Sequence, residues 1–372
     1  MKRIFFVAGE SSGDIHGANL IRALREMAPD VQCEGLGGTH MAAAGMDLRY
    51  DLAEHAIMGF TEILRSFGMI RRIFRETRAR LEASRPDAVV LIDYPGFNLR
   101  LAREAHKLEI PIIYYISPQV WAWKRKRVRT IARLVRKMLV ILPFEAALYE
   151  EAGVDSVYVG HPLLDHIPTV NVNGALRDKF VVGLLPGSRR QEIERLLPVM
   201  LDVARDIRQR HPEAYFVSPC VDAEREKQIR SVAADFPLHT QVGKTYEVLD
   251  AARFCMVASG TATVETALFG VPFVILYRVT NLTYWIARAL VRVHHIGMVN
   301  ILANKRVVPE FVQHEATRQR IVPVVFDLLE DTPARRQMIE DLAAVRAMLG
   351  TRGASQRAAG EILDVLSEKS NG

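Results

Sequence analysis

The sequence predicts an α/β protein made of two doubly wound units, each built on a parallel sheet. Short apolar runs rich in β-branched residues alternate with longer amphipathic stretches, which is the pattern of βα units. The chain has 372 residues, and an average domain has about 150, so two domains are expected. Hydrophobic residues make up 49% of the chain and charged residues 25%. This composition allows two buried cores and excludes a disordered protein.

The predicted strands form two series, separated by a break at residues 167–174. The first series comprises Ile4–Ala8, Val31–Leu36, Ala88–Asp93, Ile110–Ile116, Met138–Leu142 and Ser156–Gly160. The second comprises Phe180–Leu185, Ala214–Pro219, Leu238–Val242, Arg253–Ala258 and Pro272–Tyr277. Two helical stretches, Pro333–Leu349 and Ser355–Glu368, end the chain. We therefore expect domains over residues 1–168 and 169–345, with residues 346–372 as a terminal segment, and a ligand cleft beyond the carboxyl ends of the strands.

Charge and cysteine content exclude several classes of protein. The formal net charge is +6, from 49 basic and 43 acidic residues, and neither half forms a basic tail. The three cysteines, Cys33, Cys220 and Cys255, are too far apart for a CxxC motif and too few for a disulfide framework, which favours a reducing compartment. No run reaches the ~18 apolar residues of a transmembrane helix, and Ile4–Ala8 is too short for a signal-peptide core.

The loop Ala8–Asp14 follows the first predicted strand and opens a helix. Its glycines let the backbone approach a ligand, and the free N–H groups of the helix favour an anion or a hydroxyl-rich group. The candidate binding residues are Ser11, Ser12 and Asp14. Asp14 as a simple helix cap is the structural alternative. A second glycine loop, Gly35–Thr39, is a weaker signal of the same kind.

Asp93 is the candidate general base. It ends the predicted strand Ala88–Asp93, so its carboxylate is expected at the edge of the sheet where ligands bind. Partial burial there would raise its pKa toward the value that a general base needs. Glu10 and His16 are alternative proton acceptors, and an N-cap for the following helix is the structural alternative for Asp93.

Two strand-to-helix loops of the second half are candidate diphosphate sites. The loop after Leu185 combines a helix N-terminus with an arginine able to bind phosphate through two hydrogen bonds. The loop after Ala258 offers N–H and hydroxyl donors, and a glutamate one turn into the helix can accept from a ribose diol. The candidate residues are Gly187, Ser188, Arg189, Ser259, Gly260, Thr261 and Glu265. Together, the two loops predict that the second unit binds a nucleoside diphosphate.

Two basic segments of the first half are candidates for contact with lipid. Large apolar residues recur at helical spacing within residues 57–80, among six arginines. The candidates for membrane or acyl-chain contact are Phe60, Ile63, Leu64, Phe67, Ile70 and Phe74. The alternative is a helix that packs on the core with its arginines outside. The string Ser117–Trp123 contains Gln119, which is a further candidate binding residue. It precedes a basic run at residues 124–137. This run could bind anionic lipid headgroups, and a solvated helix face is the alternative interpretation.

The sequence predicts neither a metal nor a cofactor. It has no Asp-x-Asp pair and no HExxH motif, and the adjacent His294 and His295 point apart on a helix. A basic nucleic-acid-binding module would leave the loop around Ser259 without a role, so we expect no nucleic acid partner.

These strings together resemble the lipid-A-disaccharide synthase family of glycosyltransferases. The matching pieces are Ala8–Asp14, Met58–Phe60, Asp93–Asn98, Ser117–Trp123, Leu185–Arg189, Ser259–Ala262 with Glu265, and Asn300–Ala303. The resemblance implies a GT-B fold, with two Rossmann-like domains facing a central cleft and the last helix packing back on the first domain. It also implies that Asp93 is the base and that Arg189 and Asn300 are important for activity.

The family's reaction transfers 2,3-diacylglucosamine from its UDP carrier to 2,3-diacylglucosamine 1-phosphate. The resemblance implies inversion to a β(1→6) link, release of UDP, and no need for a metal. It further implies a peripheral protein on the cytoplasmic face of the inner membrane in Gram-negative lipid A assembly. The oligomeric state is open, with a homodimer among the alternatives. Other UDP-sugar enzymes of this fold, such as a muramyl-peptide N-acetylglucosaminyltransferase or a UDP-N-acetylglucosamine 2-epimerase, are the alternative functions.

Overall fold

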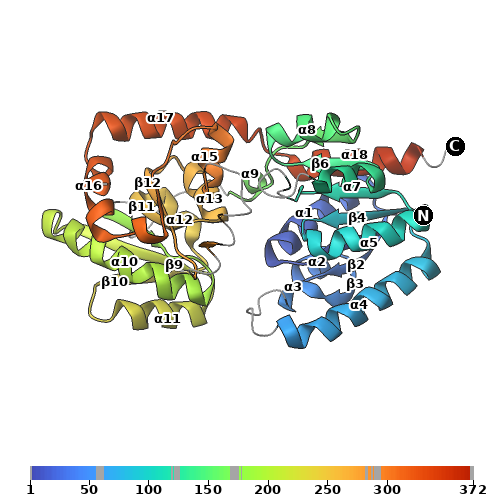
Figure 1. The fold of residues 1–372 in the computed structure, drawn as a ribbon, viewed down its shortest axis with the longest axis horizontal. Helices are drawn as coiled ribbons and strands as arrows, with labels where there is room; N and C mark the ends of the chain where they lie inside the picture. Colours follow the sequence, from blue (N-terminus) through green and yellow to red (C-terminus); the bar gives the residue numbers. More distant parts are fainter. Residues whose placement is uncertain are drawn as a thin grey trace. The chain divides into compact units, whose positions relative to one another are not determined.

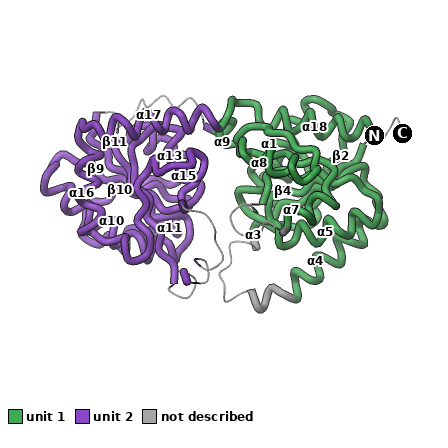
Figure 2. Tube along the Cα trace, turned by 45° about the horizontal axis from the view of Figure 1, so that its top comes forward, with its two compact units in different colours: residues 1–166, 349–372 green, residues 167–348 purple. Residues whose placement is uncertain are grey.

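The computed structural model describes residues 2–55, 63–118, 120, 126–167, 176, 178–280, 284, 285, 288 and 295–368. Contacts within the chain divide it into two compact units, shown in different colours in Figure 2. Unit 1 contains residues 1–166 and 349–372, and unit 2 contains residues 167–348. Each unit is a parallel sheet with helices (Figure 1), so the predicted fold class is confirmed.

Unit 1 is built on a seven-stranded parallel sheet with the strand order β3-β2-β1-β4-β5-β6-β7. Its strands are β1 (Arg3–Ala8), β2 (Gln32–Gly37), β3 (Asp47–Asp51), β4 (Ala88–Ile92), β5 (Ile112–Tyr115), β6 (Lys137–Val140) and β7 (Asp155–Tyr158). Its helices are α1 (Ser11–Met27), α2 (Thr39–Ala43), α3 (Leu52–His55), α4 (Ile63–Ser84), α5 (Pro95–Lys107), α7 (Lys126–Leu134), α8 (Pro143–Glu150), α9 (Leu163–His166) and α18 (Ala354–Glu368).

Both faces of this sheet are covered, and alternate residues of β1 supply the two cores. Ile4 and Phe6 join a cluster with apolar residues of α1 and α18, whereas Phe5 and Val7 join a second cluster with residues of α5 and α7. All four side chains are at most 1% exposed. A strand that is buried on both faces reads as one continuous apolar run, which is why β1 and β4 were visible in the sequence.

Unit 2 has a six-stranded parallel sheet with the strand order β10-β9-β8-β11-β12-β13. Its strands are β8 (Phe180–Leu185), β9 (Ala214–Cys220), β10 (Leu238–Val242), β11 (Ala252–Ala258), β12 (Phe273–Tyr277) and β13 (Glu310–Val312). Its helices are α10 (Arg190–Arg210), α11 (Ala223–Ala233), α12 (Thr245–Ala251), α13 (Thr261–Leu268), α15 (Met298–Ala303), α16 (Arg318–Leu329) and α17 (Pro333–Met348), with a 3₁₀ turn at Gln313–Glu315.

Each sheet has one topological switch point, where successive connections start to run in opposite directions. In unit 1 it lies between β1 and β4, and in unit 2 it lies between β8 and β11. Ligands of open α/β sheets bind beyond the carboxyl ends of the strands at this point. The loops that follow these four strands therefore define where a ligand is expected in each unit.

The last helix, α18, returns to unit 1 and lies beside α1, as Figure 1 shows. Its apolar residues Ala358, Ile362 and Leu366 belong to the same buried cluster as the α1 face. In the part of the chain that the structure describes, no helix is long and apolar enough to cross a membrane.

Candidate active site

The loop after β1 packs closely against Tyr94, the residue that follows the candidate base Asp93. A Cβ atom at Gly9 would lie 2.2 Å from the ring of Tyr94, so only glycine fits there. Glu10 occupies the N-cap position of α1 without a side-chain cap, and Ser11 and Ser12 are exposed in the first turn. The first helical N–H groups are therefore free of side-chain acceptors, as a binding loop requires.

Asp14 is buried beneath this loop, where it braces the loop after β2. Its carboxylate accepts hydrogen bonds from the backbone N–H groups of Gly38 at 2.8 Å, His40 at 3.0 Å and Met41 at 3.0 Å. The His40 Nδ1 atom lies 2.9 Å from the same carboxylate. Asp14 thus caps the start of α2 and joins the two glycine loops of unit 1. A direct contact between Asp14 and substrate stays a prediction.

Asp93 directly follows β4 at the switch point of unit 1. Burial first and the nearby Glu10 carboxylate second raise the pKa of its carboxyl to about 6, although a hydrogen bond from the Tyr94 N–H opposes the shift. A carboxylate with this pKa is ionised at neutral pH and still basic enough to accept a proton in a reaction. The structure thus brings Asp93 and Glu10 into one electrostatic site.

Two buried donors that sequence reasoning did not select hold the backbone of Asp93. Its carbonyl oxygen accepts from Asn98 Nδ2 at 2.8 Å and from Tyr114 Oη at 2.6 Å. Both Asp93 and Tyr94 have φ of +44°, a left-handed conformation that costs non-glycine residues roughly 1–2 kcal/mol each. Asn98 lay within the string used for the family resemblance, whereas nothing in the sequence pattern marked Tyr114.

His16, the alternative base, lies beside His166 with ring centroids 5.8 Å apart. Burial and then the His166 and His161 rings lower the pKa of His16 to about 3, although Asp165 opposes the shift. Such an imidazole is neutral and a weak base at neutral pH, so burial disfavours His16 as the proton acceptor, and Asp93 stays the predicted base.

The predicted lipid-contact residues are described only in part. Phe60 and Gln119 lie outside the described residues, as do the side chains of Ile63, Leu64 and Phe67. Ile70 and Phe74 pack against the core of unit 1, and the Phe74 ring meets Phe97 edge-on at 5.6 Å between centroids. This end of α4 therefore has the core-facing arrangement that was the alternative interpretation.

The loop after β8 presents Arg189 to solvent. Gly187 has φ of +108°, and a Cβ atom there would lie 2.2 Å from the carboxylate of Glu192. Glu192 accepts from the Arg189 N–H at 3.2 Å and lies 3.7 Å from its guanidinium. The Arg189 side chain is 79% exposed, so its remaining N–H groups are available to an anion. Ser188 belongs to the same loop, and its carbonyl accepts from Arg225 at 3.3 Å.

The loop after β11 contains Ser259 and Gly260 and leads into α13 at Thr261. Ser259 N–H donates to the Leu276 carbonyl at 3.0 Å, while Gly260 and Thr261 are exposed. Glu265, one turn further on, accepts from Tyr246 Oη at 3.2 Å. Burial raises the pKa of Glu265, although this hydrogen bond opposes the shift. The Glu265 carboxyl therefore lies one turn from the loop, and one of its oxygens already accepts a hydrogen bond from Tyr246.

Asn300 is fully buried in α15 and holds the segment before β13. Its Oδ1 accepts from the N–H groups of Val307 and Val308, each at 2.8 Å. Its Nδ2 donates to the Val308 carbonyl at 2.7 Å and to Glu310 at 2.8 Å. With all four bonds made inside the protein, the structure gives Asn300 a bracing role. Its predicted part in catalysis is not tested by this geometry.

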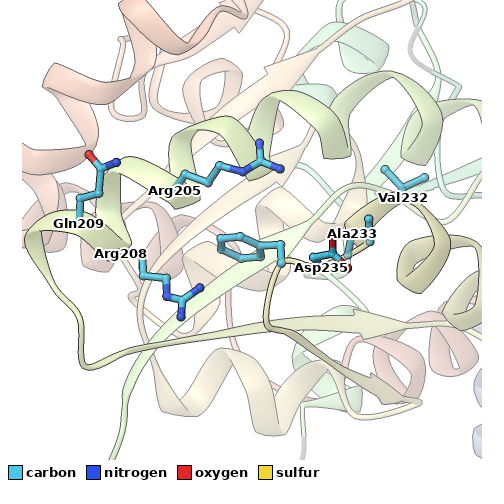
Figure 3. A pocket seen from close by; sticks show the side chains of 8 residues that line it. Arg205, Arg208, Gln209, Val232, Ala233 and Asp235 are labelled. Atoms are coloured by element: carbon cyan, nitrogen blue, oxygen red, sulfur yellow. The ribbon is translucent and has the colours of Figure 1, made fainter.

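One surface hollow of unit 2, shown in Figure 3, has a volume of about 560 Å³ and lies away from these loops. Arg205, Arg208 and Gln209 extend from the end of α10, and Val232 and Asp235 come from the end of α11 and beyond. Helices of βα units run antiparallel to the strands, so the ends of these helices lie at the amino edge of the sheet. The hollow is therefore separate from the candidate site. No cluster of three or more His, Cys, Asp or Glu able to hold a metal occurs among the residues that the structure describes.

The sequence match of the chain to known proteins is nearly full-length. A family model described as lipid-A-disaccharide synthetase matches residues 4–360. The chain belongs to the lipid-A-disaccharide synthase family. It is 42% identical to the lipid-A-disaccharide synthase of Geobacter metallireducens, covering 99% of this chain and 98% of the relative. It is 44% identical to that of Syntrophus aciditrophicus, covering 96% of each.

Solved structures agree with the GT-B fold expected for this family of glycosyltransferases. A calicheamicin glycosyltransferase matches with a TM-score of 0.62 at 14% identity, covering 99% of this chain and 98% of the other. The UDP-GlcNAc 2-epimerase of Neisseria meningitidis, solved with UDP-GlcNAc bound, matches with a TM-score of 0.67 at 14% identity, covering 98% and 100%. At such identities the likeness concerns the fold alone. The full-length relatives do not favour the muramyl-peptide transferase or the epimerase as the function of this lipid-A-disaccharide synthase family member.

Proposed function

We propose that the protein transfers 2,3-diacylglucosamine from UDP-2,3-diacylglucosamine to 2,3-diacylglucosamine 1-phosphate, which forms the β(1→6) disaccharide 1-phosphate and releases UDP. The observation that carries the mechanism is Asp93, a mostly buried carboxylate with a pKa of about 6 at the switch point of unit 1. Membership in the synthase family supports the substrates.

In the proposed mechanism Asp93 accepts the proton of the acceptor's 6-hydroxyl as that oxygen attacks the anomeric carbon. The carbon–oxygen bond to the diphosphate breaks on the opposite face, so the anomeric configuration inverts. Glu10 lies close enough to raise the pKa of Asp93, which strengthens Asp93 as a base. Unit 1 is the acceptor side in this proposal.

Unit 2 is the proposed UDP side. The exposed guanidinium of Arg189 and the N–H groups of the loop at Gly187 and Ser188 would stabilise the charge that develops on the leaving diphosphate. Ser259 to Thr261 form the second loop at the same switch point, and Glu265 would accept from the ribose. Donors held in place by the fold need no rearrangement when the charge appears.

Because both substrates carry acyl chains, we further propose that the protein associates with a lipid surface on the cytoplasmic face of the inner membrane. The basic segments around residues 57–80 and 124–137 support this proposal through their composition. Flotation with anionic vesicles, compared with neutral vesicles, tests it. A homodimer stays a prediction that light scattering of the purified chain would test.

Replacing Asp93 tests the proposed base. We expect Asp93→Asn to lower kcat at least ~100-fold with UDP affinity unchanged, since the base acts in the chemical step and contributes about that factor. In the parent, kcat/KM should fall below about pH 6, because a protonated Asp93 cannot accept the acceptor's proton. UDP release from the two purified acyl-sugar substrates in detergent measures both effects.

The matched control is Asp30→Asn, which removes an exposed carboxylate of unit 1 before β2. It should retain full turnover. Near-normal turnover by Asp93→Asn would remove Asp93 from the mechanism, and absence of UDP release with this substrate pair in the parent would refute the proposed reaction.

Arg189 provides a test of the diphosphate site. Arg189→Gln should weaken UDP binding roughly 10- to 100-fold, which is the scale of a lost hydrogen bond to a charged group. Arg190→Gln is the control, because the neighbouring guanidinium bonds to Glu194 at 2.9 Å instead. Isothermal titration with UDP measures both affinities, and equal affinities in the two variants would contradict the assignment.

A further inference from the structure

The turn that carries the candidate base has an unusual backbone. Asp93 and Tyr94 are consecutive non-glycine residues with φ of +44° each. A left-handed conformation is uncommon for residues other than glycine, asparagine and aspartate, and it persists only where the surroundings impose it. A glycine would adopt this conformation without strain, so neighbouring contacts must hold Asp93 and Tyr94 in it.

Two buried donors impose the conformation from one side. Asn98 Nδ2 and Tyr114 Oη both donate to the Asp93 carbonyl, at 2.8 and 2.6 Å, and Asn98 Nδ2 also reaches the Ile92 carbonyl at 3.2 Å. Asn98 and Tyr114 are both 0% exposed. These bonds lock the Asp93 carbonyl toward the interior and leave the carboxylate on the side of Glu10.

Ring packing imposes the conformation from the other side. The Tyr94 ring lies so close to Gly9 that a Cβ atom at Gly9 would be 2.2 Å away, and the ring stacks on Phe97 with centroids 6.2 Å apart. The Asp93 N–H donates to the Tyr115 carbonyl at 3.1 Å. The turn is therefore held at its amide, at its carbonyl and at the next side chain.

We infer that Asn98 and Tyr114 are positioning residues for the transfer reaction: by holding the Asp93 carbonyl, they keep the carboxylate aimed at the acceptor side without touching substrate. The inference rests on the proposed role of Asp93 as base. A turn of the Asp93 peptide toward ordinary negative φ would swing the Cα–Cβ bond and move the carboxylate away from its buried place. Both side chains are fully buried and donate to backbone carbonyls, Tyr114 to that of Asp93 and Asn98 to those of Asp93, Ile92 and Val7.

Tyr114→Phe is the sharpest test, since it deletes one hydroxyl and keeps the ring. We expect kcat to fall roughly 10-fold with KM and thermal unfolding nearly unchanged, because a misplacement of about 1 Å in a reacting group costs up to about 100-fold. The acid limb of the kcat/KM profile should also move below pH 6, since a released carboxylate gains water and its pKa drops. Asn98→Ser, which removes the other donor, should act in the same direction.

Tyr149→Phe is the matched control. Tyr149 is equally buried and belongs to the same core cluster as Tyr114, and its hydroxyl hydrogen-bonds to Ser117 Oγ at 2.7 Å rather than to the Asp93 turn. The structural loss of one buried, hydrogen-bonded tyrosine hydroxyl should affect both variants alike, whereas positioning of Asp93 concerns Tyr114 alone. Equal kinetics and equal pH profiles for the two variants would overturn the inference.

A double mutant separates this inference from the proposed function. In an Asp93→Asn background, Tyr114→Phe should have no further effect on the residual turnover, because it acts through the carboxylate. If Tyr114→Phe still lowers turnover 10-fold there, the positioning role fails while Asp93 as base stands. If Asp93→Asn alone is fully active, the base assignment fails and takes the positioning role with it.

Discussion

At the scale of residues, the candidate side chains differ in what their polar atoms already contact. Asp14 and Asn300 are buried, and hydrogen bonds to loop backbone occupy them. The Arg189 guanidinium is mostly exposed, and the Asp93 carboxylate is held at its backbone but is not in an ion pair among the described residues. The sequence motifs mark all four residues as candidate site residues and do not distinguish between them. Only the three-dimensional contacts show which of their polar atoms are free for a ligand.

Asn300 gives a prediction about stability. Asn300→Ala should lower the free energy of unfolding by about 2–4 kcal/mol, because it removes four buried hydrogen bonds, with the Val307 and Val308 N–H groups, the Val308 carbonyl and Glu310. Urea unfolding measures the change. Loss of activity would then follow from disorder of the segment before β13 rather than from a lost contact with substrate.

Asn304→Gly is the control for Asn300. Asn304 is exposed with φ of +48°, a conformation that glycine adopts without cost, so its replacement should be nearly neutral. An Asn300→Ala variant that is inactive yet as stable as the parent would show that Asn300 acts on the substrate directly.

At the scale of elements, α18 is the part of unit 1 most distant in sequence from the rest. Asp165, on α9, accepts from Gly353 N–H at 2.6 Å and from Ser355 N–H at 3.1 Å, and so caps the first turn of α18. Arg357, in that turn, donates to the Val159 carbonyl at 2.8 Å. Hydrogen bonds thus define where α18 starts, and its apolar residues pack along α1.

Removing this cap should loosen the start of α18. Asp165→Ala should lower the free energy of unfolding by about 1–2 kcal/mol, the usual effect of a lost N-cap. It should also speed amide hydrogen exchange at residues 353–355. Hydrogen exchange followed by mass spectrometry measures the effect. Asp364→Ala, on the exposed face of the same helix, should leave exchange there unchanged. Unaltered exchange in Asp165→Ala would show that packing on α1 alone defines this end.

Most strands could be predicted from sequence, among them the edge strands β7 and β10, whereas the edge strands β3 and β13 could not. β8 and β10 have the predicted bounds, Phe180–Leu185 and Leu238–Val242. β3 is largely polar and half-exposed, and β13 has only three residues, so neither forms an apolar run. An edge strand pairs on one side only and can be polar or very short, so β3 and β13 lack the apolar run that marked the predicted strands.

At the scale of the whole molecule, two buried histidines link stability to pH. Burial lowers the pKa of His161 to about 4, and burial with neighbouring histidines lowers that of His16 to about 3. Unfolded histidine titrates near 6.5, so below that pH the unfolded chain binds protons that the folded chain does not. Stability from these groups is complete above about pH 6.5 and falls with pH toward about 4. Asp93, with its raised pKa of about 6, opposes this trend over part of the window.

His16→Gln should flatten this dependence. Between pH 6 and pH 4 the loss of stability per pH unit should become smaller by about 1.4 kcal/mol, the effect of one proton. Urea unfolding at several pH values measures the slope, with the exposed His106→Gln as control. A parent and a His16→Gln variant with the same slope would show that His16 is not the source.

The sequence by itself determined the α/β class, the order of most strands, the glycine loops at strand ends and the family, because buried strands and close backbone approaches demand particular residue types at short spacing. The tertiary structure alone decided that β1, β4, β8 and β11 flank the switch points, and that Asn98 and Tyr114 hold Asp93. It also decided that Asp14 and Asn300 brace loops. These outcomes depend on contacts between residues far apart in the chain, which no local pattern encodes.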